Sequence, residues 1–271
     1  MTLGRIWPDA WRATLKHAYA NPKSLFARRL AVEEGGPAPG QYGEYEQAFL
    51  EKVLRDENAL NDVLNVTISL MPDGFHQRLA DHFAPDSFDA TAAVDITHDY
   101  RERYYFDEIS RSDVTQPDHL HAGMYGLMGI ELKVRSKSSV KQLLHYALLA
   151  AREEMRHPYE GKHLILLLTP YADLAEATYE KVIDGDHAKE AMLAAIPDYL
   201  TDHRRKFVTE QHLRDVTERI TVAHASFSDF VEMMEREVVG STGPAVSTLN
   251  RLIEGASAEF KRHSLIAKRP F

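Results

Sequence analysis

Two acidic residues and a lysine near the middle of the chain have the types and spacing that metal-assisted chemistry requires. Twelve residues separate Asp118 from Glu131, and Lys133 lies two positions beyond Glu131. The residues around this glutamate and lysine alternate between apolar and charged, which is typical of a strand. Because alternate residues of a strand project from the same face, Glu131 and Lys133 are predicted to point together to one side.

This set of charges indicates hydrolysis of a phosphodiester. Two carboxylates and a lysine on a core strand are costly to bury unless something pairs with them. Mg²⁺ is a natural partner, because it binds one or two carboxylates together with waters and phosphate oxygens. Such an ion lowers the pKa of a bound water and neutralises a leaving oxygen, while a lysine positions the water or stabilises the phosphate.

A hairpin is expected to bring the first carboxylate to the second. Residues 114–121 are predicted to form one strand and residues 127–134 the next, with glycines at the turn between them. This arrangement would place Asp118 alongside Glu131.

These residues resemble the signature of a known family. The Pro-Asp pair that ends at Asp118, followed after twelve residues by the Glu-Leu-Lys from Glu131 to Lys133, resembles the motif of the PD-(D/E)XK nuclease superfamily. Gln142 and Tyr146 resemble the Q-x-x-x-Y motif of its RecB-like branch. The resemblance implies a metal-dependent nuclease with Asp118 and Glu131 as metal ligands and Lys133 as the catalytic lysine. It also implies that Gln142 and Tyr146 lie on the following helix, near the DNA backbone and the active site.

The resemblance also implies a fold and a cofactor. It implies a restriction-endonuclease-like α/β core, in which helices flank a mixed central β-sheet. The apolar pattern of the chain itself predicts helical extensions at both ends of this core. Mg²⁺ is the expected cofactor, and Mn²⁺ is expected to substitute for it. In many nucleases of this superfamily the helix before the sheet contributes a glutamate near the metal, a role open to Glu44 or Glu46.

The first metal carboxylate has competing candidates in this chain. Asp118 is preferred because its spacing to the glutamate matches the family, and chemistry alone would not separate it from Asp113. Asp95, Asp107 and Glu108 are further candidates. The glutamate and lysine of the motif also fit the solvated face of an edge strand.

Other motif residues have alternative roles in the fold. Ser139 and Gln142 fit a capping box at a helix start. Tyr146 falls on an apolar helical stripe, as a core residue would. His119 and His121 alternate on the first strand of the hairpin and suggest zinc, although no third ligand is evident.

The composition limits the class of protein. The 271 residues are 44% hydrophobic and 27% charged, which suits one sizeable globular domain with extensions. The chain has no cysteine, which excludes the four-cysteine iron–sulfur cluster of some RecB-like nucleases. No apolar run reaches the length of a membrane span and the N-terminus lacks an apolar signal core, so we expect a cytoplasmic protein without membrane association.

The formal net charge of −9 requires a DNA-binding protein to concentrate positive charge locally. Four segments are basic enough to form such patches, namely 28–29, 135–141, 203–206 and 261–269. Each of these segments also fits an ordinary solvated surface.

The order of the predicted elements agrees with a nuclease core. Three parts are expected, namely an N-terminal helical extension at 1–40, the core at 41–239, and a C-terminal helix with a basic tail at 240–271. Strands are predicted at 90–100, 103–110, 163–168 and 220–225 besides the hairpin, and helices at 42–56, 59–70, 74–82, 139–156, 173–199 and 228–237. A strand, a helix and a buried strand in succession form a crossover unit, which implies a mixed or parallel sheet.

The sequence therefore favours a Mg²⁺-dependent deoxyribonuclease. An endonuclease in restriction, defence or DNA processing is expected, because no Walker-type loop for an attached motor is present. One alternative is a catalytically silent protein of the nuclease fold that binds DNA or assembles with other proteins. Another is a metal-dependent hydrolase of a different phosphoester. The expected partners are DNA, a second copy of the chain, and a protein of a larger nuclease or defence complex.

Overall fold

The computed structural model divides into two compact units, one of residues Pro72–Met233 and one of Met1–Met71 with Met234–Phe271. The first unit holds the central sheet and the motif residues from Asp118 to Tyr146. The structure describes residues 61, 64–65, 67–68, 70–97, 100–104, 117–133, 138–156, 160–170, 185–239, 246, 249–250, 252–257 and 260–261. The predicted boundaries at residues 40 and 240 stay predictions.

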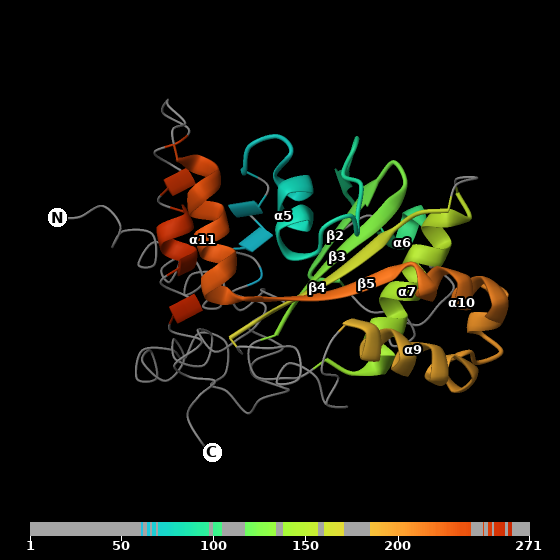
Figure 1. Ribbon diagram of the computed structural model, residues 1–271. Helices are drawn as coiled ribbons and strands as arrows, with labels where there is room; N and C mark the ends of the chain where they lie inside the picture. The colour runs from blue at the N-terminus through green and yellow to red at the C-terminus, as the bar shows by residue number, and fades with distance from the viewer. Residues whose placement is uncertain are drawn as a thin grey trace, which may run out of the picture. The chain divides into compact units, whose positions relative to one another are not determined.

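A five-stranded mixed β-sheet forms the centre of the first unit, with the strands in chain order (Figure 1). Its strands are β1 (Val94–Asp95), β2 (His119–Gly123), β3 (Gly126–Leu132), β4 (His163–Thr169) and β5 (Ile220–Ser226). The strand β2 is antiparallel to both of its neighbours, β1 and β3, whereas β3, β4 and β5 run parallel. The predicted α/β architecture, a mixed sheet flanked by helices, is therefore confirmed.

The hairpin of β2 and β3 has the predicted form, although its first strand begins later, at His119. Its two-residue turn lies between Gly123 and Gly126, which pair with each other. Neither position has space for a side chain. A Cβ at Gly123 would overlap the carbonyl oxygen of Asp89, and one at Gly126 would overlap that of Lys162. The glycines therefore allow the neighbouring backbone to approach the turn closely.

The helix α7 (Val140–Glu154) connects β3 to β4, and both elements match the prediction. Ser139 begins the helix, and its hydroxyl accepts a hydrogen bond from the backbone N–H of Gln142 at 3.2 Å. Every residue of β4 is buried, as expected for a continuous apolar strand with neighbours on both sides and cover on both faces.

Further helices lie before, between and after these strands along the chain, and those between β4 and β5 complete the second crossover. They are α5 (Phe75–Phe83), α9 (Gly185–Tyr199), the short 3₁₀ helix η3 (Arg204–Lys206), α10 (Glu210–Glu218) and α11 (Phe227–Val238). Figure 1 shows α5 on one side of the sheet and α7 with α9 on the other. One large apolar cluster fills the space between α7, α9, α10 and the face of the sheet that they cover.

Among the described residues, the strand predicted at 90–100 is confirmed only at its centre, and the start of the strand predicted at 103–110 is not a strand. Only Val94–Asp95 forms a strand, and α6 (Tyr100–Arg103) is helical. The side chain of Asp95 accepts a hydrogen bond from the backbone N–H of Thr97 at 2.8 Å, a local turn that competes with the ladder. Arg103 and the following Tyr104 both bind the carboxylate of Glu153, at 2.6 to 2.9 Å. This long-range contact outweighs the strand preference of the aromatic residues. Residues 105–110 lie outside the described part.

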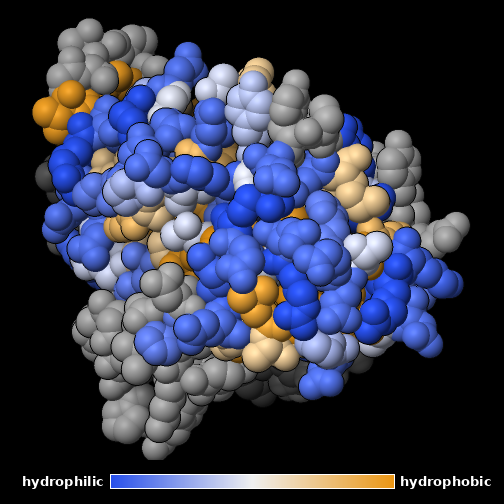
Figure 2. Space-filling model, turned by 45° about the vertical axis from the view of Figure 1, so that its right-hand side comes forward, coloured by the Kyte–Doolittle hydropathy of each residue, from blue (hydrophilic) through white to orange (hydrophobic). Residues whose placement is uncertain are grey.

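Among the described residues, no helix is both long and apolar enough to cross a membrane. Figure 2 shows a face on which hydrophilic side chains cover most of the coloured surface, with small separate apolar patches. Large exposed apolar side chains include Val94, Met124 and Tyr125, at or near the β1 edge of the sheet. Such scattered apolar side chains are ordinary on a protein surface.

Candidate active site

Glu131 projects from β3 toward α7, and its neighbour Gly129 shows why. The two residues are two positions apart and therefore share a face of the strand. A Cβ at Gly129 would overlap two ring carbons of Tyr146. The missing side chain thus lets the ring lie directly on β3, with its hydroxyl at the level of Glu131.

The carboxylate of Glu131 is buried and has three donors around it. The residue is 3% exposed. Tyr146 donates its hydroxyl proton to Oε2, and the amide of Gln142 donates to Oε1. The ammonium of Lys133 lies 2.6 Å from the same Oε1. The predicted motif residues on β3 and α7 therefore meet at one carboxylate.

Lys133 and Glu131 lie on the same side of β3, as the alternation predicts, because their side chains form an ion pair. All seven residues of β3 are buried. The alternative of an edge strand is wrong, because β3 pairs with β2 on one side and β4 on the other. The charges therefore lie inside the fold and require partners.

Asp118 lies across the hairpin from Glu131. His119 pairs with Ile130, so the position before β2 falls opposite the position after Ile130. The carboxylate of Asp118 accepts a hydrogen bond from the backbone N–H of Leu132 at 2.8 Å. This bond fixes the aspartate beside β3, as the predicted hairpin requires.

Tyr146 is a hydrogen-bond donor in this group. Burial raises the pKa of its hydroxyl well above the usual value, and the nearby carboxylates of Glu131 and Asp118 raise it further. The hydroxyl therefore stays protonated at neutral pH. It stabilises and orients the glutamate, and it does not supply a tyrosinate base.

Gln142 belongs to both the helix start and the carboxylate group. Its backbone N–H donates to Ser139, which is half of the predicted capping box. Its side chain turns to Glu131, so the reciprocal half of the box gives way to a contact with β3. The alternatives of cap and site residue are therefore both partly correct for Gln142.

The donor set fits a hard divalent cation. Two carboxylates and one ammonium give this group of charged residues a formal charge of −1, and Mg²⁺ binds one or two carboxylates with waters and phosphate oxygens. In the described part of the chain, no group of three or more His, Asp or Glu side chains is placed to hold a metal ion. The predicted third ligand, Glu44, lies outside the described residues, as does Glu46.

The structure describes only one of the other candidates for the first metal carboxylate. Asp95 pairs with His121, which lies on the face of the sheet opposite Glu131. It is therefore not a partner for Glu131 on this sheet. Three other candidates, Asp107, Glu108 and Asp113, lie outside the described residues.

The two histidines of β2 belong to a cluster on that opposite face. The ring of His121 lies 3.9 Å from that of His76 on α5 and 6.4 Å from that of His119, centroid to centroid. Burial, and next the charge of His76, lower the pKa of His121 to about 3, so its ring is neutral. The rings of His119 and His121 are nearly parallel. Among the described residues no third side chain completes a metal-binding group with them, and the zinc alternative stays a prediction.

One of the predicted basic patches is partly used by the fold. Arg204 is buried, its guanidinium lies 4.3 Å from the ring centroid of Tyr199, and it donates to the Tyr199 carbonyl at 2.9 Å. Arg205 and Lys206 are exposed. Segment 28–29 lies outside the described residues, as do Arg135, Lys137 and residues 262–269.

A second polar group was missed by the sequence analysis and lies at the carboxyl ends of β4 and β5. The hydroxyl of Thr169 lies 2.9 Å from Nε2 of His224. His224 is in register with Leu167 of β4, which is in register with Glu131 of β3. Both residues fall at strand ends of a crossover unit, the one signal that could have identified them.

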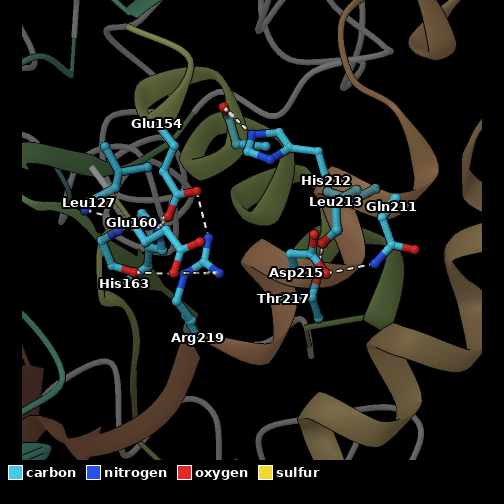
Figure 3. Close-up of polar contacts among 12 residues, drawn as sticks. Leu127, Glu154, Glu160, His163, Gln211, His212, Leu213, Asp215, Thr217 and Arg219 are labelled. Atoms are coloured by element: carbon cyan, nitrogen blue, oxygen red, sulfur yellow. Dashed lines mark hydrogen bonds and ion pairs between the residues drawn. The ribbon is translucent and has the colours of Figure 1, made fainter. Parts of the chain in front are cut away.

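A third polar group, also missed, joins the opposite ends of the same strands (Figure 3). The carboxylate of Glu154 accepts hydrogen bonds from His163 at 2.9 Å and Arg219 at 2.6 Å. Nδ1 of His163 in turn accepts the backbone N–H of Leu127 at 3.0 Å. Because Nδ1 accepts, the proton of the neutral ring lies on Nε2 and is donated to Glu154. The group ties the end of α7 to β3, β4 and β5.

Comparisons with protein-family models, with curated proteins and with solved structures found no match. The resemblance to PD-(D/E)XK nucleases therefore depends on the motif residues, and the assignment of a restriction-endonuclease-like core stays a prediction.

Proposed function

We propose that this protein is a metal-dependent nuclease that hydrolyses phosphodiester bonds of DNA. The observation that carries the proposal is the ion pair of Lys133 with Glu131, at 2.6 Å, inside a group that also holds Asp118 across the hairpin. Two carboxylates and a lysine are the parts that such hydrolysis requires. A restriction-endonuclease-like core is part of the same proposal.

Each residue of the group has a proposed role. Asp118 and Glu131 would hold Mg²⁺ or Mn²⁺, which when bound supplies an activated water and neutralises charge on the phosphate. Lys133 orients the attacking water or stabilises the phosphate with its positive charge. Gln142 and Tyr146 keep the carboxylate of Glu131 in one orientation, so they are positioning residues.

The burial of Glu131 supports a site more than an ordinary surface pair. A carboxylate that is 3% exposed loses most of its hydration, so an incomplete set of partners would be costly. Here two neutral donors and one ammonium hold it. Preorganised charges of this kind act strongly in a site from which water is excluded.

Cleavage of supercoiled plasmid tests the proposal. Wild type would be incubated with Mg²⁺, Mn²⁺ or EDTA, and compared with Glu131→Gln and Lys133→Met. We expect nicked or linear DNA with either metal, none with EDTA, and losses of at least about 100-fold in both variants. Linear duplex, single strand, RNA and a nucleotide ester, run in parallel, would identify the substrate class and separate endonuclease from exonuclease.

Two matched control variants test whether a loss of cleavage is specific to the site or follows from any change of charge. Glu218→Gln on α10 and Lys162→Met before β4 change exposed residues of the same types. Both are expected to cleave like wild type. Equal activity of Glu131→Gln and wild type would contradict the proposal, as would cleavage that EDTA does not stop.

The alternative of a catalytically silent protein also has an observation in its favour. The contacts of Gln142, Tyr146 and Lys133 already compensate Glu131, as in a purely structural network. Calorimetry with Mg²⁺ distinguishes the two. Metal binding that Asp118→Asn and Glu131→Gln abolish supports the nuclease, whereas DNA binding without metal binding or cleavage supports the silent protein.

A further inference from the structure

The carboxyl ends of β3, β4 and β5 form one polar edge. The three strands are parallel, so these ends meet at the same side of the sheet. Ligands of open α/β sheets bind outside the carboxyl ends of their strands. Glu131 is the candidate metal ligand at this edge, and its register partner two strands away is His224.

A second row of residues continues the edge beyond Glu131. The backbone N–H of Lys133 donates to the carbonyl of Leu168 at 2.9 Å, which extends the pairing of β3 and β4 past the last strand residue. Lys133 therefore falls beside Thr169 on β4. The edge thus runs from the lysine through Thr169 to His224, whose Nε2 lies 2.9 Å from the threonine hydroxyl.

The Thr169–His224 contact is not needed to join the two strands. β4 and β5 already pair in register over their whole length, from His163 with Ile220 to Thr169 with Ser226. Ser226, by contrast, has a local role, because its hydroxyl accepts from the backbone N–H of Asp229 at the start of α11. A buried threonine that fixes a partly exposed imidazole instead matches the support of a binding residue.

We propose that His224 binds a DNA backbone phosphate within a few nucleotides of the one that is cleaved, with Thr169 as its positioning residue. The inference rests on the proposed nuclease function. Adjacent strands are about 4.8 Å apart, so the edge from β3 to β5 spans roughly 10 Å. One DNA strand advances about 3.4 Å along the helix axis per nucleotide. A phosphate within a few nucleotides of Glu131 therefore reaches β5, where an imidazole N–H can donate to it.

Thr169 can hold His224 in position whether the imidazole ring is neutral or charged. Its hydroxyl can donate to Nε2 of a neutral ring or accept from Nε2 of a charged one. In the neutral ring that accepts from Thr169, the proton lies on Nδ1. Replacing Thr169 by valine removes the hydroxyl that determines which ring nitrogen carries the proton, while the side chain keeps nearly the same shape.

DNA affinity of the full-length protein tests the inference without cleavage. Binding of a short fluorescein-labelled duplex would be measured by anisotropy in EDTA, and kcat and KM in Mg²⁺. We expect His224→Gln to weaken binding about tenfold to 100-fold, as for one lost hydrogen bond to a charged group. Thr169→Val should show a smaller loss in the same direction, and Thr169→Ser should restore affinity. KM should rise while kcat changes little, which a structural role alone would not produce.

Two matched controls lie on other parts of the sheet and its cover. Thr221→Val changes an exposed threonine of β5 at its amino end, and His82→Gln changes an exposed histidine of α5. Both should bind like wild type, and circular dichroism should show every variant folded. If wild type binds and cleaves DNA but His224→Gln binds equally well, the inference is overturned and the nuclease proposal stands. If wild type neither binds nor cleaves, both fall together. If wild type binds DNA without cleaving it and the His224 and Thr169 variants bind more weakly, the two residues belong to a DNA-binding surface and the nuclease proposal is overturned.

Discussion

The ring of Tyr146 lies against Gly129, at a position on β3 where even a methyl group would overlap it. The contact connects α7 to the strand two residues before Glu131, the residue that the Tyr146 hydroxyl binds. A residue without a side chain thus sets the depth at which the helix approaches the sheet. The candidate site depends on this close approach as much as on its charged residues.

Gly129→Ala is expected to destabilise the fold and weaken activity together. The added methyl must displace the Tyr146 ring, and overpacking a core costs about 1–3 kcal/mol. Urea unfolding and plasmid cleavage measure the two effects. In the double variant with Tyr146→Ala the clash is relieved, so the two losses should be clearly less than additive. Strict additivity would show that the ring and the glycine are not coupled.

Tyr146→Phe removes one donor from a buried carboxylate and leaves the packing intact. We expect a loss of about 1–3 kcal/mol in the free energy of unfolding. Because Glu131 then has greater freedom, cleavage should fall about tenfold. Denaturant unfolding and initial cleavage rates give the two values. The control is Tyr125→Phe, which changes an exposed tyrosine at the β2–β3 turn and should alter neither.

Alkaline pH should destabilise the protein through its buried tyrosines. Burial raises the pKa of Tyr146 and of Tyr104, and the carboxylates that they contact, Glu131 and Glu153, raise it further. In the unfolded chain both hydroxyls ionise near pH 10. Their contribution is therefore complete below pH 10 and is lost as the pH rises further. Unfolding measured from pH 8 to 11 should show this decline, and Tyr146→Phe should make it shallower.

Acid should destabilise the fold through Glu154, because the folded state lowers the pKa of this carboxyl below its ordinary value. Burial alone would raise the pKa of this carboxyl, but hydrogen bonds from His163, Arg219 and the Gly161 N–H outweigh it and lower the pKa to about 2. The stabilisation is complete above the ordinary value of 4.5 and disappears as the pH falls toward about 2. Glu154→Gln should cost on the order of 3 kcal/mol at neutral pH and flatten this acid limb. Its matched control is Glu160→Gln, a side chain that is 84% exposed, which should change neither.

The histidine cluster should change the stability of the fold at a higher pH than Glu154 does. Burial, and next the charge of His76, lower the pKa of His121 to about 3, and burial also lowers that of His76. His119 and Asp95 face the same ring. Below about pH 6.5 these histidines bind protons in the unfolded chain, whereas the folded cluster does not. The free energy of unfolding should therefore fall from about pH 6.5 toward pH 3. His121→Leu should reduce this slope in pH-dependent unfolding. An unchanged slope, equal to that of the exposed control His82→Gln, would show that the cluster does not titrate as described.

The sequence was sufficient for the central hairpin, the crossover helix and the meeting of five motif residues. Alternation in β3, the Ser139 cap and the apolar run of β4 are local patterns, and local patterns persist in the fold. They also correctly placed Lys133 on the same side of β3 as Glu131, because alternate residues of a strand project from the same face. They could not show that Glu131 would have three donors, since that depends on how closely α7 approaches β3.

Long-range contacts account for most of what was missed. Tyr104 looked like a strand residue, yet it donates to Glu153, 49 residues later, from the end of a helix. The contact of Thr169 with His224 joins residues 55 positions apart. No window of sequence contains both members of such a pair. Only the order of the strands in the sheet brings them together.

The start of α7 has a rotational consequence for the chemistry at Glu131. Ser139 fixes the residue at which the helix begins, and Gln142 and Tyr146 follow at positions that face β3. Each residue of an α-helix advances the side-chain direction by about 100°. If the first turn began one residue later, both side chains would swing away from the carboxylate even though no motif residue had changed. The phase of one helix therefore decides whether Glu131 has hydrogen-bond donors on α7.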